Sequence, residues 1–178
     1  MGYHPAQERV LAERRRFNVA AMGRRWGKTV FGQEQILFEP GGAIDGAPVG
    51  WFAPTYKLLI DVWKSVERSC TRISRRVNRD DKRIELVTGG VVDFWTLEDI
   101  DAGRGRMYAR IVIDEAAHAR NLEEAWTKAI LPTLTDLKGE AWFISTPAGN
   151  NYFRDLHALG DPANGSRHQD WQSWRLPT

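Results

Sequence analysis

The chain has 178 residues, of which 42% are hydrophobic and 27% are charged, and these proportions fit one soluble globular domain with a substantial core. Its formal net charge of +2 is too small to indicate a nucleic-acid-binding protein by itself. The single cysteine, Cys70, excludes a fold held by disulfides and favours a reducing compartment. No apolar run approaches the length of a membrane span or a secretory signal, so we expect neither.

The first predicted elements are a short helix, a buried strand and a second helix. Pro5 suits the first turn of a helix that runs to about Arg14. The apolar run Phe17-Asn18-Val19-Ala20-Ala21-Met22 predicts the strand. A glycine-bearing turn follows, and the residues after it predict a helix that continues to Leu37.

The turn between this strand and helix, Gly23-Arg24-Arg25-Trp26-Gly27-Lys28-Thr29, has the order of a phosphate-binding loop. Gly27 lets the backbone approach phosphates without a Cβ, and the helix N-terminus offers free N–H groups to an anion. Lys28 supplies a charge for the outer phosphates, and the Thr29 hydroxyl is suited to bind Mg²⁺. The strict pattern has a glycine where this chain has Met22, so the spacing describes a variant loop, with a plain strand-turn-helix as the alternative.

The next segment predicts a surface loop, a short strand and a long amphipathic helix. The strand is Val49-Gly50-Trp51-Phe52-Ala53, and Thr55 suits the N-cap of the helix. Apolar residues at steps of three and four predict its buried face: Leu59, Val62, Trp63, Val66, Cys70, Ile73 and Val77. A basic stripe falls on the opposite face: Arg68, Arg72, Arg75 and Arg79. This stripe suits a DNA phosphate backbone, and the alternative is a solvated helix face.

The middle of the chain predicts a β-hairpin, a loop and a buried strand. The hairpin joins Arg83–Val87 to Val91–Trp95 through Thr88-Gly89-Gly90. A polar, glycine-bearing loop over Asp99–Arg106 leads to an apolar run that ends in Asp114-Glu115. Such a run predicts a buried parallel strand, and its acidic C-terminal end is where ligands bind in open α/β sheets.

The last part of the chain alternates helix and strand. Asn121 suits the cap of a helix that Pro132 closes. Ala141–Ile144 predicts another buried strand, and Ser145-Thr146-Pro147 stops it. A helix follows over about residues 152–159, and the residues after it are polar and turn-rich.

Three predicted strands therefore end in residues that suit nucleotide chemistry. They end in Gly27-Lys28-Thr29, in Asp114-Glu115 and in Ser145-Thr146. Asp114 is suited to organise Mg²⁺, and Glu115 beside it is suited to take a proton from water. That second role distinguishes a hydrolase from a kinase, which aims a substrate hydroxyl at the phosphate instead.

On these motifs the chain resembles the ATPase domain of the large terminase subunit of tailed bacteriophages, a genome-packaging motor, over nearly its whole length. The family's loop has the form Gly/Ser-Arg-x-x-Gly-Lys-Thr/Ser, which Gly23–Thr29 matches, displaced first glycine included. Arg104-Gly105 is similar to the Arg-Gly pair that the family places before its Asp-Glu strand. Ser145-Thr146-Pro147 resembles its coupling motif, and Ala53-Pro54-Thr55-Tyr56-Lys57 resembles the segment after its second strand.

The resemblance implies a role for each of these residues. It implies nucleotide binding by Gly23, Arg24, Arg25, Trp26, Gly27, Lys28 and Thr29, with Arg24 at the γ-phosphate. It implies metal binding by Thr29 and Asp114, activation of water by Glu115, and coupling to DNA movement by Ser145 and Thr146. Arg104 is the candidate for an arginine finger that reaches a neighbouring subunit's nucleotide, and the alternative is a solvent-facing loop arginine. Tyr3 and Gln7 resemble the adenine-recognition segment, although spacing alone favours a solvent-exposed glutamine at position 7.

The implied fold is an α/β P-loop NTPase of the RecA/ASCE-like type, with a central, mostly parallel sheet flanked by helices, plus a β-hairpin. We expect residues 1–160 to form the ATPase domain and residues 161–178 to begin a linker toward a nuclease domain that this chain does not encode. The implied cofactors are ATP and Mg²⁺. The implied partners are double-stranded DNA, a homo-oligomeric ring on the portal protein of a procapsid, and the small terminase subunit. The expected location is the host cytoplasm, with transient docking on the procapsid and no membrane.

Two other functions stay open at this point. Asp114-Glu115-Ala116-Ala117 is close to the motif of superfamily-2-type helicases, but a helicase needs a second such domain. The other alternative is a nucleotide-gated binding module that turns over nothing, and the paired acids argue against it.

Overall fold

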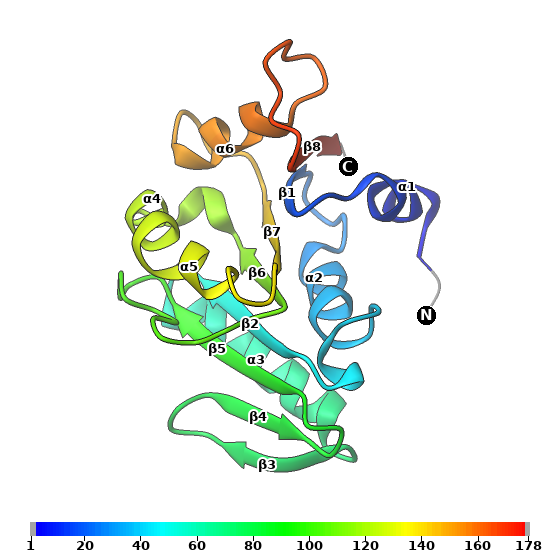
Figure 1. Ribbon diagram of the computed structural model, residues 1–178, viewed down its shortest axis with the longest axis vertical. Helices are drawn as coiled ribbons and strands as arrows, with labels where there is room; N and C mark the ends of the chain where they lie inside the picture. Colours follow the sequence, from blue (N-terminus) through cyan, green and yellow to red (C-terminus); the bar gives the residue numbers. More distant parts are fainter. Residues whose placement is uncertain (1–2, 177–178) are drawn as a thin grey trace.

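The computed structural model describes residues 3–176 and centres on one sheet of eight strands (Figure 1). The strands are β1 Phe17–Met22, β2 Pro48–Ala53, β3 Ser74–Asn78, β4 Arg83–Leu86, β5 Val91–Thr96, β6 Arg110–Asp114, β7 Glu140–Ser145 and β8 Trp171–Leu176. Their order is β3-β4-β5-β2-β6-β7-β1-β8. The six strands from β5 to β8 in this order are parallel neighbours. The predicted α/β class with a mostly parallel sheet is therefore confirmed.

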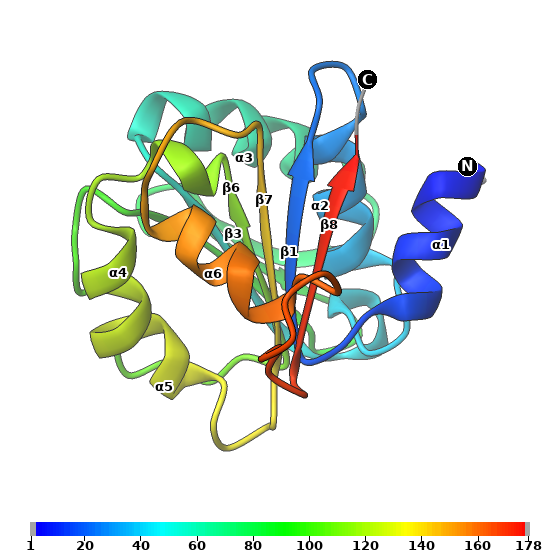
Figure 2. The same ribbon diagram turned by 90° about the horizontal axis from the view of Figure 1, so that it is seen from above.

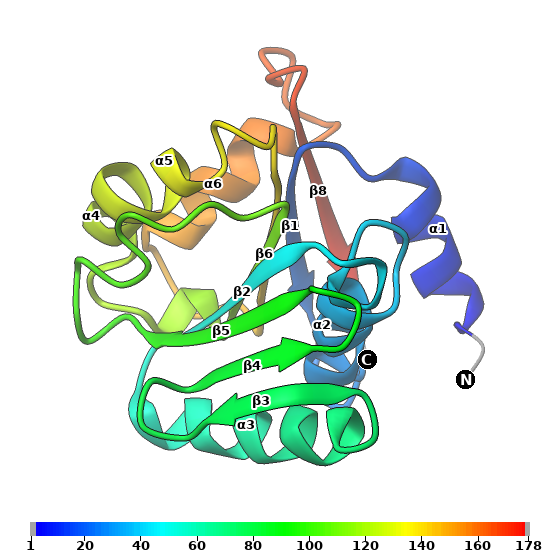
Figure 3. The ribbon, with the colours of Figure 1, turned by 60° about the horizontal axis from the view of Figure 1, so that its bottom comes forward.

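The other end of the sheet is an antiparallel meander of β3, β4 and β5 (Figure 3). Its second turn, between β4 and β5, is the predicted hairpin, with Glu85 opposite Val91. Gly89 in this turn has φ 91°, a backbone region that glycine adopts at little cost. The hairpin prediction is confirmed, and β3 is an additional strand beside it.

Two layers of helices cover the sheet (Figure 2). The helices are α1 Pro5–Glu13, α2 Lys28–Leu37, α3 Tyr56–Cys70, α4 Leu122–Ala125, α5 Leu131–Thr133 and α6 Tyr152–Gly160, with short turns at Ala43–Asp45 (η1), Ala116–His118 (η2) and Trp126–Ile130 (η3). Residues of α1, α2 and α3 share one core cluster with Trp51 and Trp142. Residues of α4, η3 and α6 share the other with Phe52 and Phe143. Successive side chains of a strand point to opposite faces of the sheet. A strand that contributes to both clusters must therefore be apolar at successive positions.

Burial on both faces of the sheet explains why the sequences of the central strands are continuous apolar runs. Every residue of β1 and of β6 is buried. Gly32 of α2 lies so close to the sheet that a Cβ there would approach the Trp51 ring to 2.8 Å. The close packing of α2 fixes its N-terminus, and therefore the turn before it, against the end of β1.

The helix after β2 is shorter than its apolar spacing predicts. Thr55 caps it as predicted, since its hydroxyl oxygen accepts from the Leu58 N–H at 3.5 Å. The helix ends at Cys70, and Ser74–Asn78 form β3 instead of a further turn and a half. The predicted helical stripe of four arginines is therefore wrong, because Arg68 alone of the four lies in α3.

Two local features explain where α3 stops. The Thr71 hydroxyl donates to the carbonyl of Glu67 at 3.0 Å, a bond by which threonine competes with continued helix. The β-branched residues Ile73 and Val77 favour strand, and Val77 pairs with Ile84 of β4. A hydrophobic period of three to four residues cannot by itself reveal this antiparallel partner.

The remaining corrections concern a helix cap and the last strand. Asn121 precedes α4 without a side-chain capping bond, and the helical segment continues through the π-turn η3 to Thr133, one residue beyond Pro132. Trp171–Leu176, which we expected within a linker, forms β8 and pairs in parallel with all of β1. The sheet therefore extends beyond the boundary expected at residue 160, while the nuclease domain stays a prediction. Within residues 3–176, none of the helices combines the length and apolar character that crossing a membrane requires.

Candidate nucleotide-binding site

The C-terminal ends of three adjacent strands form the candidate site. β7 lies between β1 and β6 and is parallel to both, so these three strands end at the same edge of the sheet. The phosphate-loop residues follow β1, Asp114 ends β6, and Ser145 ends β7. The topology therefore brings together the three polar strand ends that the sequence singles out.

The turn after β1 has the backbone geometry of an anion-binding loop. Arg25 and Gly27 have φ values of 65° and 86°, both in the left-handed region. Gly27 is the N-cap of α2 and has no side chain that could cap the first N–H groups. The first N–H groups of α2 therefore remain available to an anion at the positive end of the helix dipole.

Lys28 connects the loop to both of the other strand ends. Its Nζ donates to Thr146 Oγ1 at 3.0 Å and lies 3.6 Å from Glu115 Oε1. The Lys28 side chain is only 11% exposed, so its charge is poorly hydrated and interacts strongly with groups beside it. A phosphate at the helix N-terminus would enter a position already framed by this lysine.

Asp114 lies beside the hydroxyl of the loop threonine. Thr29 Oγ1 donates to Asp114 Oδ2 at 3.3 Å, and the Glu115 N–H donates to Asp114 Oδ1 at 2.9 Å. Burial and then the negative charge of Glu115 raise the pKa of Asp114 to about 6. The two hydrogen bonds and the charge of Lys28 act in the opposite direction.

Glu115 has a backbone conformation that few non-glycine residues adopt. Its φ of 48° and ψ of 40° place it in the left-handed region. In a continued strand, neighbouring side chains would point to opposite faces, whereas this turn lets Asp114 and Glu115 share one edge. Ser145 Oγ donates to Glu115 Oε2 at 3.4 Å, and His118 Nε2 lies 3.6 Å from the same oxygen. Non-glycine residues in the left-handed backbone region, such as Glu115, occur often at functional sites.

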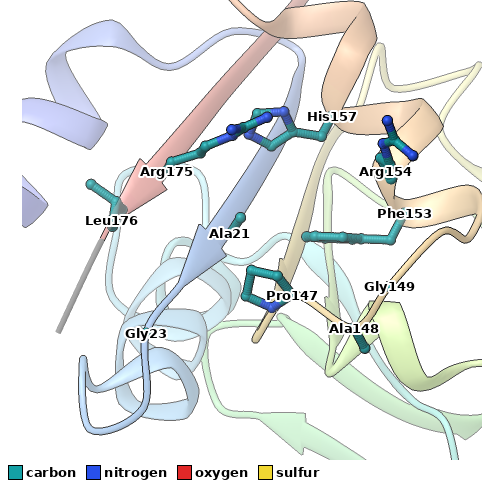
Figure 4. A pocket seen from close by; sticks show the side chains of 10 residues that line it. All are labelled: Ala21, Gly23, Pro147, Ala148, Gly149, Phe153, Arg154, His157, Arg175 and Leu176. Atoms are coloured by element: carbon teal, nitrogen blue, oxygen red, sulfur yellow. The ribbon is translucent and has the colours of Figure 1, made fainter.

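Lys28, Glu115 and Thr146 face a cavity of about 480 Å³, a volume that suits a small-molecule ligand. Its lining residues are Arg24, Arg25, Lys28, Leu58, Glu115, His118, Thr146 and Pro147. A second cavity of about 430 Å³ lies between α6 and β8 and is mainly apolar (Figure 4). Of the predicted nucleotide-site residues, it includes Gly23 alone. We therefore assign the candidate site to the first cavity.

The adenine-recognition candidates lie on the α1 side of the loop. Gln7 is near the phosphate loop, since a Cβ on Gly27 would be 3.9 Å from Gln7 Nε2. The oxygen of the same amide accepts from the His4 N–H at 3.1 Å, and the His4 ring packs edge-on against Trp26. The Tyr3 hydroxyl donates to Glu39 at 2.9 Å, a residue that lies after α2 and not in the phosphate loop.

The remaining predicted site residues lie elsewhere. Arg104 is in the loop between β5 and β6, and its guanidinium pairs with Asp101 at 2.7 Å with a side chain 60% exposed. It does not line the nucleotide cavity. The four arginines of the predicted stripe are divided between α3, the turn after it, β3 and the turn before β4.

Three residues that line the cavity were not predicted as site residues from the sequence. His118 follows Glu115 by three residues, a spacing within one helical turn that was the available signal. Leu58 lies in the first turn of α3, directly after β2, and Pro147 follows the Ser-Thr pair. Neither apolar residue carries a chemical signal of its own.

The fold and the site together define a P-loop-type nucleotide-binding α/β domain: strand, glycine-bearing turn, Lys-Thr helix, and an acidic strand end opposite. The large terminase subunit of Escherichia phage T5 is 32% identical over 153 residues, which cover 83% of this chain and 34% of that protein. The large terminase subunit of Thermus phage G20c is 29% identical over 191 residues, which cover 90% and 37%. This chain thus spans about a third of the length of these relatives.

Solved structures of phage large terminases are similar to this chain in fold. The ATPase domain of the Thermus phage P74-26 large terminase has a TM-score of 0.77 at 23% identity, covering 98% of this chain and 81% of that one. The large terminase of a thermophilic bacteriophage, solved in complex with ADP, has a TM-score of 0.69 at 16% identity, covering 98% and 45%. No protein-family model matches the chain. The chain is therefore related in sequence to bacteriophage large terminase subunits, and its fold is that of their ATPase domains.

Proposed function

We propose that this chain is the ATPase domain of a phage genome-packaging motor, which hydrolyses ATP to translocate double-stranded DNA into a procapsid. The observation that carries the proposal is the convergence of Lys28, Thr29, Asp114, Glu115 and Thr146 at one edge of the sheet, with contacts of 3.0 to 3.6 Å. The relatives named large terminase subunit support it. Structures of the thermophilic bacteriophage terminase with ADP and with ATP-gamma-S support nucleotide binding by this fold.

The phosphates of ATP bind at the N-terminus of α2. The N–H groups after Gly27 donate to the β-phosphate, and Lys28 neutralises the outer phosphates. Arg24 and Arg25, which line the same cavity, add positive charge, with Arg24 at the γ-phosphate. On the α1 side, Gln7 has the amide donor and acceptor that an adenine edge requires, and Tyr3 belongs to the same segment.

The donor set suits Mg²⁺. Thr29 Oγ1 and the Asp114 carboxylate are adjacent oxygen ligands, which Mg²⁺ prefers. Mg²⁺ is commonly bound through one or two carboxylates together with substrate phosphates. When bound, Mg²⁺ neutralises charge on the transferring phosphate.

Glu115 acts as the general base on water, and Thr146 couples hydrolysis to DNA. The contact of Glu115 with Ser145 and the contact of Lys28 with Thr146 support a link from the γ-phosphate to the segment after β7. Loss of the γ-phosphate changes the negative charge beside Lys28, and this change alters the hydrogen bond from Lys28 Nζ to Thr146 Oγ1. The segment after β7 therefore responds directly to the state of the nucleotide.

The roles of Arg104, of the partners and of the DNA-binding arginines follow from the proposed terminase function. Arg104, on an exposed loop, acts in trans as an arginine finger in a ring of identical subunits. The ring docks on the portal of a procapsid in the host cytoplasm and works with the small terminase subunit. The arginines at 68, 72, 75 and 79 contribute to DNA binding.

The test of the proposed function is Glu115→Gln, which keeps the size of the side chain and removes the base. Turnover of ATP in the presence of double-stranded DNA should fall by about two to four orders of magnitude. Binding of a fluorescent ADP analogue should stay within about twofold, because the base acts in the transition state. The control is Glu124→Gln on α4, an exposed acid that pairs with Lys128. Unchanged turnover in Glu115→Gln would overturn the assignment of Glu115 as the general base.

A further inference from the structure

Asp93, on β5, is the centre of a buried hydrogen-bond network. Its residue is 3% exposed. Arg83 Nη1 donates to its two carboxylate oxygens at 3.0 and 3.1 Å, and the Tyr108 hydroxyl donates to Oδ2 at 2.9 Å. Trp95 Nε1 donates in turn to the Tyr108 oxygen at 2.8 Å, and Arg106 Nε lies 3.9 Å from Asp93 Oδ2. A carboxylate this deeply buried is tolerated only with such partners.

The network fastens one end of the loop that carries Arg104. Arg106 is the last residue of the predicted loop, and Tyr108 follows two residues later. Burial raises the pKa of Tyr108 far above its usual value, so the hydroxyl stays protonated and donates to Asp93. The Tyr108 N–H also donates to the carbonyl of Thr133 at 2.8 Å. The C-terminal end of the loop is therefore held by side-chain and backbone bonds.

The other end of the loop is held by packing. The Leu97 N–H donates to the carbonyl of Ala53 at 2.8 Å, and Ala102 is 1% exposed. Gly103 has φ +79°, and a Cβ there would lie 3.0 Å from the Phe52 ring. Between the two anchors, Arg104 projects with a largely exposed side chain whose partner, Asp101, is itself half exposed. Exposed pairs of this kind contribute little, so the anchors set the direction of the tip.

We propose that Asp93 and Tyr108 are positioning residues for Arg104: they fix the loop so that its guanidinium is presented to the nucleotide of a neighbouring subunit. The inference rests on the proposed role of Arg104 and adds two residues to it. An arginine that acts across an interface must be placed within a fraction of an ångström, and a misplacement of 1 Å costs about a hundredfold in rate. A buried carboxylate with a fixed hydroxyl donor supplies that precision better than an exposed ion pair does.

The first experiment tests the anchoring without reference to catalysis. Backbone hydrogen exchange is measured in the whole chain for Tyr108→Phe and Asp93→Asn. The Arg104 and Arg106 amides, which donate to the carbonyls of Asp101 and Gly103, should exchange at least about tenfold faster, while β1 amides stay unchanged. The control is Tyr152→Phe on α6, which removes a hydroxyl that does not belong to the Asp93 network. Unchanged loop exchange in both variants would overturn the inference.

The second experiment is a double-mutant cycle with Arg104→Ala. Turnover is measured as a function of protein concentration, because a trans contribution requires association. Tyr108→Phe keeps the ring that packs against Phe52 and should lower the concentration-dependent turnover about tenfold, with affinity for ADP within about twofold. In the Arg104→Ala background the same substitution should cause no further loss. Equal losses in both backgrounds would indicate a general structural effect and overturn the inference.

The two experiments separate this inference from the function on which it rests. If Arg104→Ala leaves concentration-dependent turnover unchanged while loop exchange rises, the role of Arg104 is overturned and the anchoring is supported. If loop exchange is unchanged while Arg104→Ala abolishes that turnover, the anchoring is overturned and the role of Arg104 is supported.

Discussion

The two ends of the sheet hold their charged residues in different surroundings. In the parallel part, the candidate site contains charged groups that are nearly buried, with Lys28 11% and Asp114 6% exposed. In the antiparallel meander, the arginines of β3 and the turn after it lie on the surface. Arg79 pairs with Glu67 at 2.7 Å and Arg75 with Glu85 at 3.9 Å, and both arginine side chains are 74% exposed.

This difference separates two kinds of charged group. A buried charge interacts strongly with its neighbours, and removing one partner leaves the others poorly compensated. An exposed ion pair contributes about 0 to 1 kcal/mol and can exchange its partner for a ligand phosphate. Substitutions of the nearly buried charged groups should therefore change chemistry, whereas substitutions of the exposed arginines on β3 and in the turns beside it should change association with nucleic acid and leave turnover nearly intact.

The strongest test of the comparison is Lys28→Ala. Loss of this charge removes a phosphate contact and leaves Glu115 without its nearest cation, so turnover should fall by about a hundredfold to a thousandfold. Steady-state ATP hydrolysis measures the effect. Lys128→Ala is the matched control, because Lys128 is an exposed lysine on the α4 side that pairs with Glu124. A loss in the control as large as that in Lys28→Ala would remove the distinction between the two parts of the sheet.

A smaller effect is expected from single arginines of β3 and of the turns on either side of it. Within residues 3–176, Arg72 and Arg76 form no ion pair, whereas Arg79 is held by Glu67. Arg72→Ala and Arg76→Ala should each reduce the slope of log affinity for duplex DNA against log salt by about 0.9. Arg79→Ala should reduce it less. Titrations at several salt concentrations measure the slopes, and equal slopes for all three variants would contradict a role for the free arginines.

The smallest expected effect tests whether residues 74–78 are strand in solution. Threonine favours strand and alanine favours helix, and in a host protein the β-propensity scale spans about 1 kcal/mol. In β3, Arg76→Thr should therefore unfold at a higher urea concentration than Arg76→Ala. The reverse order would support the helical pattern that the spacing first predicted.

The site was predictable because its signals are local and parallel topology brings strand ends together. Gly27-Lys28-Thr29 and Asp114-Glu115 each follow an apolar run, and parallel strands have their C-terminal ends on one edge of the sheet. The direct contact between Lys28 and Thr146 joins residues 118 positions apart, and no spacing rule gives that distance.

Strand β3 and the Asp93 network were not predictable for a related reason. Ile73 and Val77 fit a helical face and also fit a strand, and only the pairing of Val77 with Ile84 decides between them. Asp93 reads as a polar residue in a hairpin strand. Its partners come from β4 and from the loop before β6, and this convergence exists only in the folded chain.

The place of β8 has a mechanical consequence for the phosphate loop. The N–H of Gly23, the first residue of that loop, donates to the carbonyl of Leu176 at 2.8 Å, so the loop begins on a bond to the outermost strand. A pull along β8 would stretch this bond before it disturbed the well-packed centre of the sheet. The edge strand is thus coupled directly to the first residue of the candidate phosphate-binding loop.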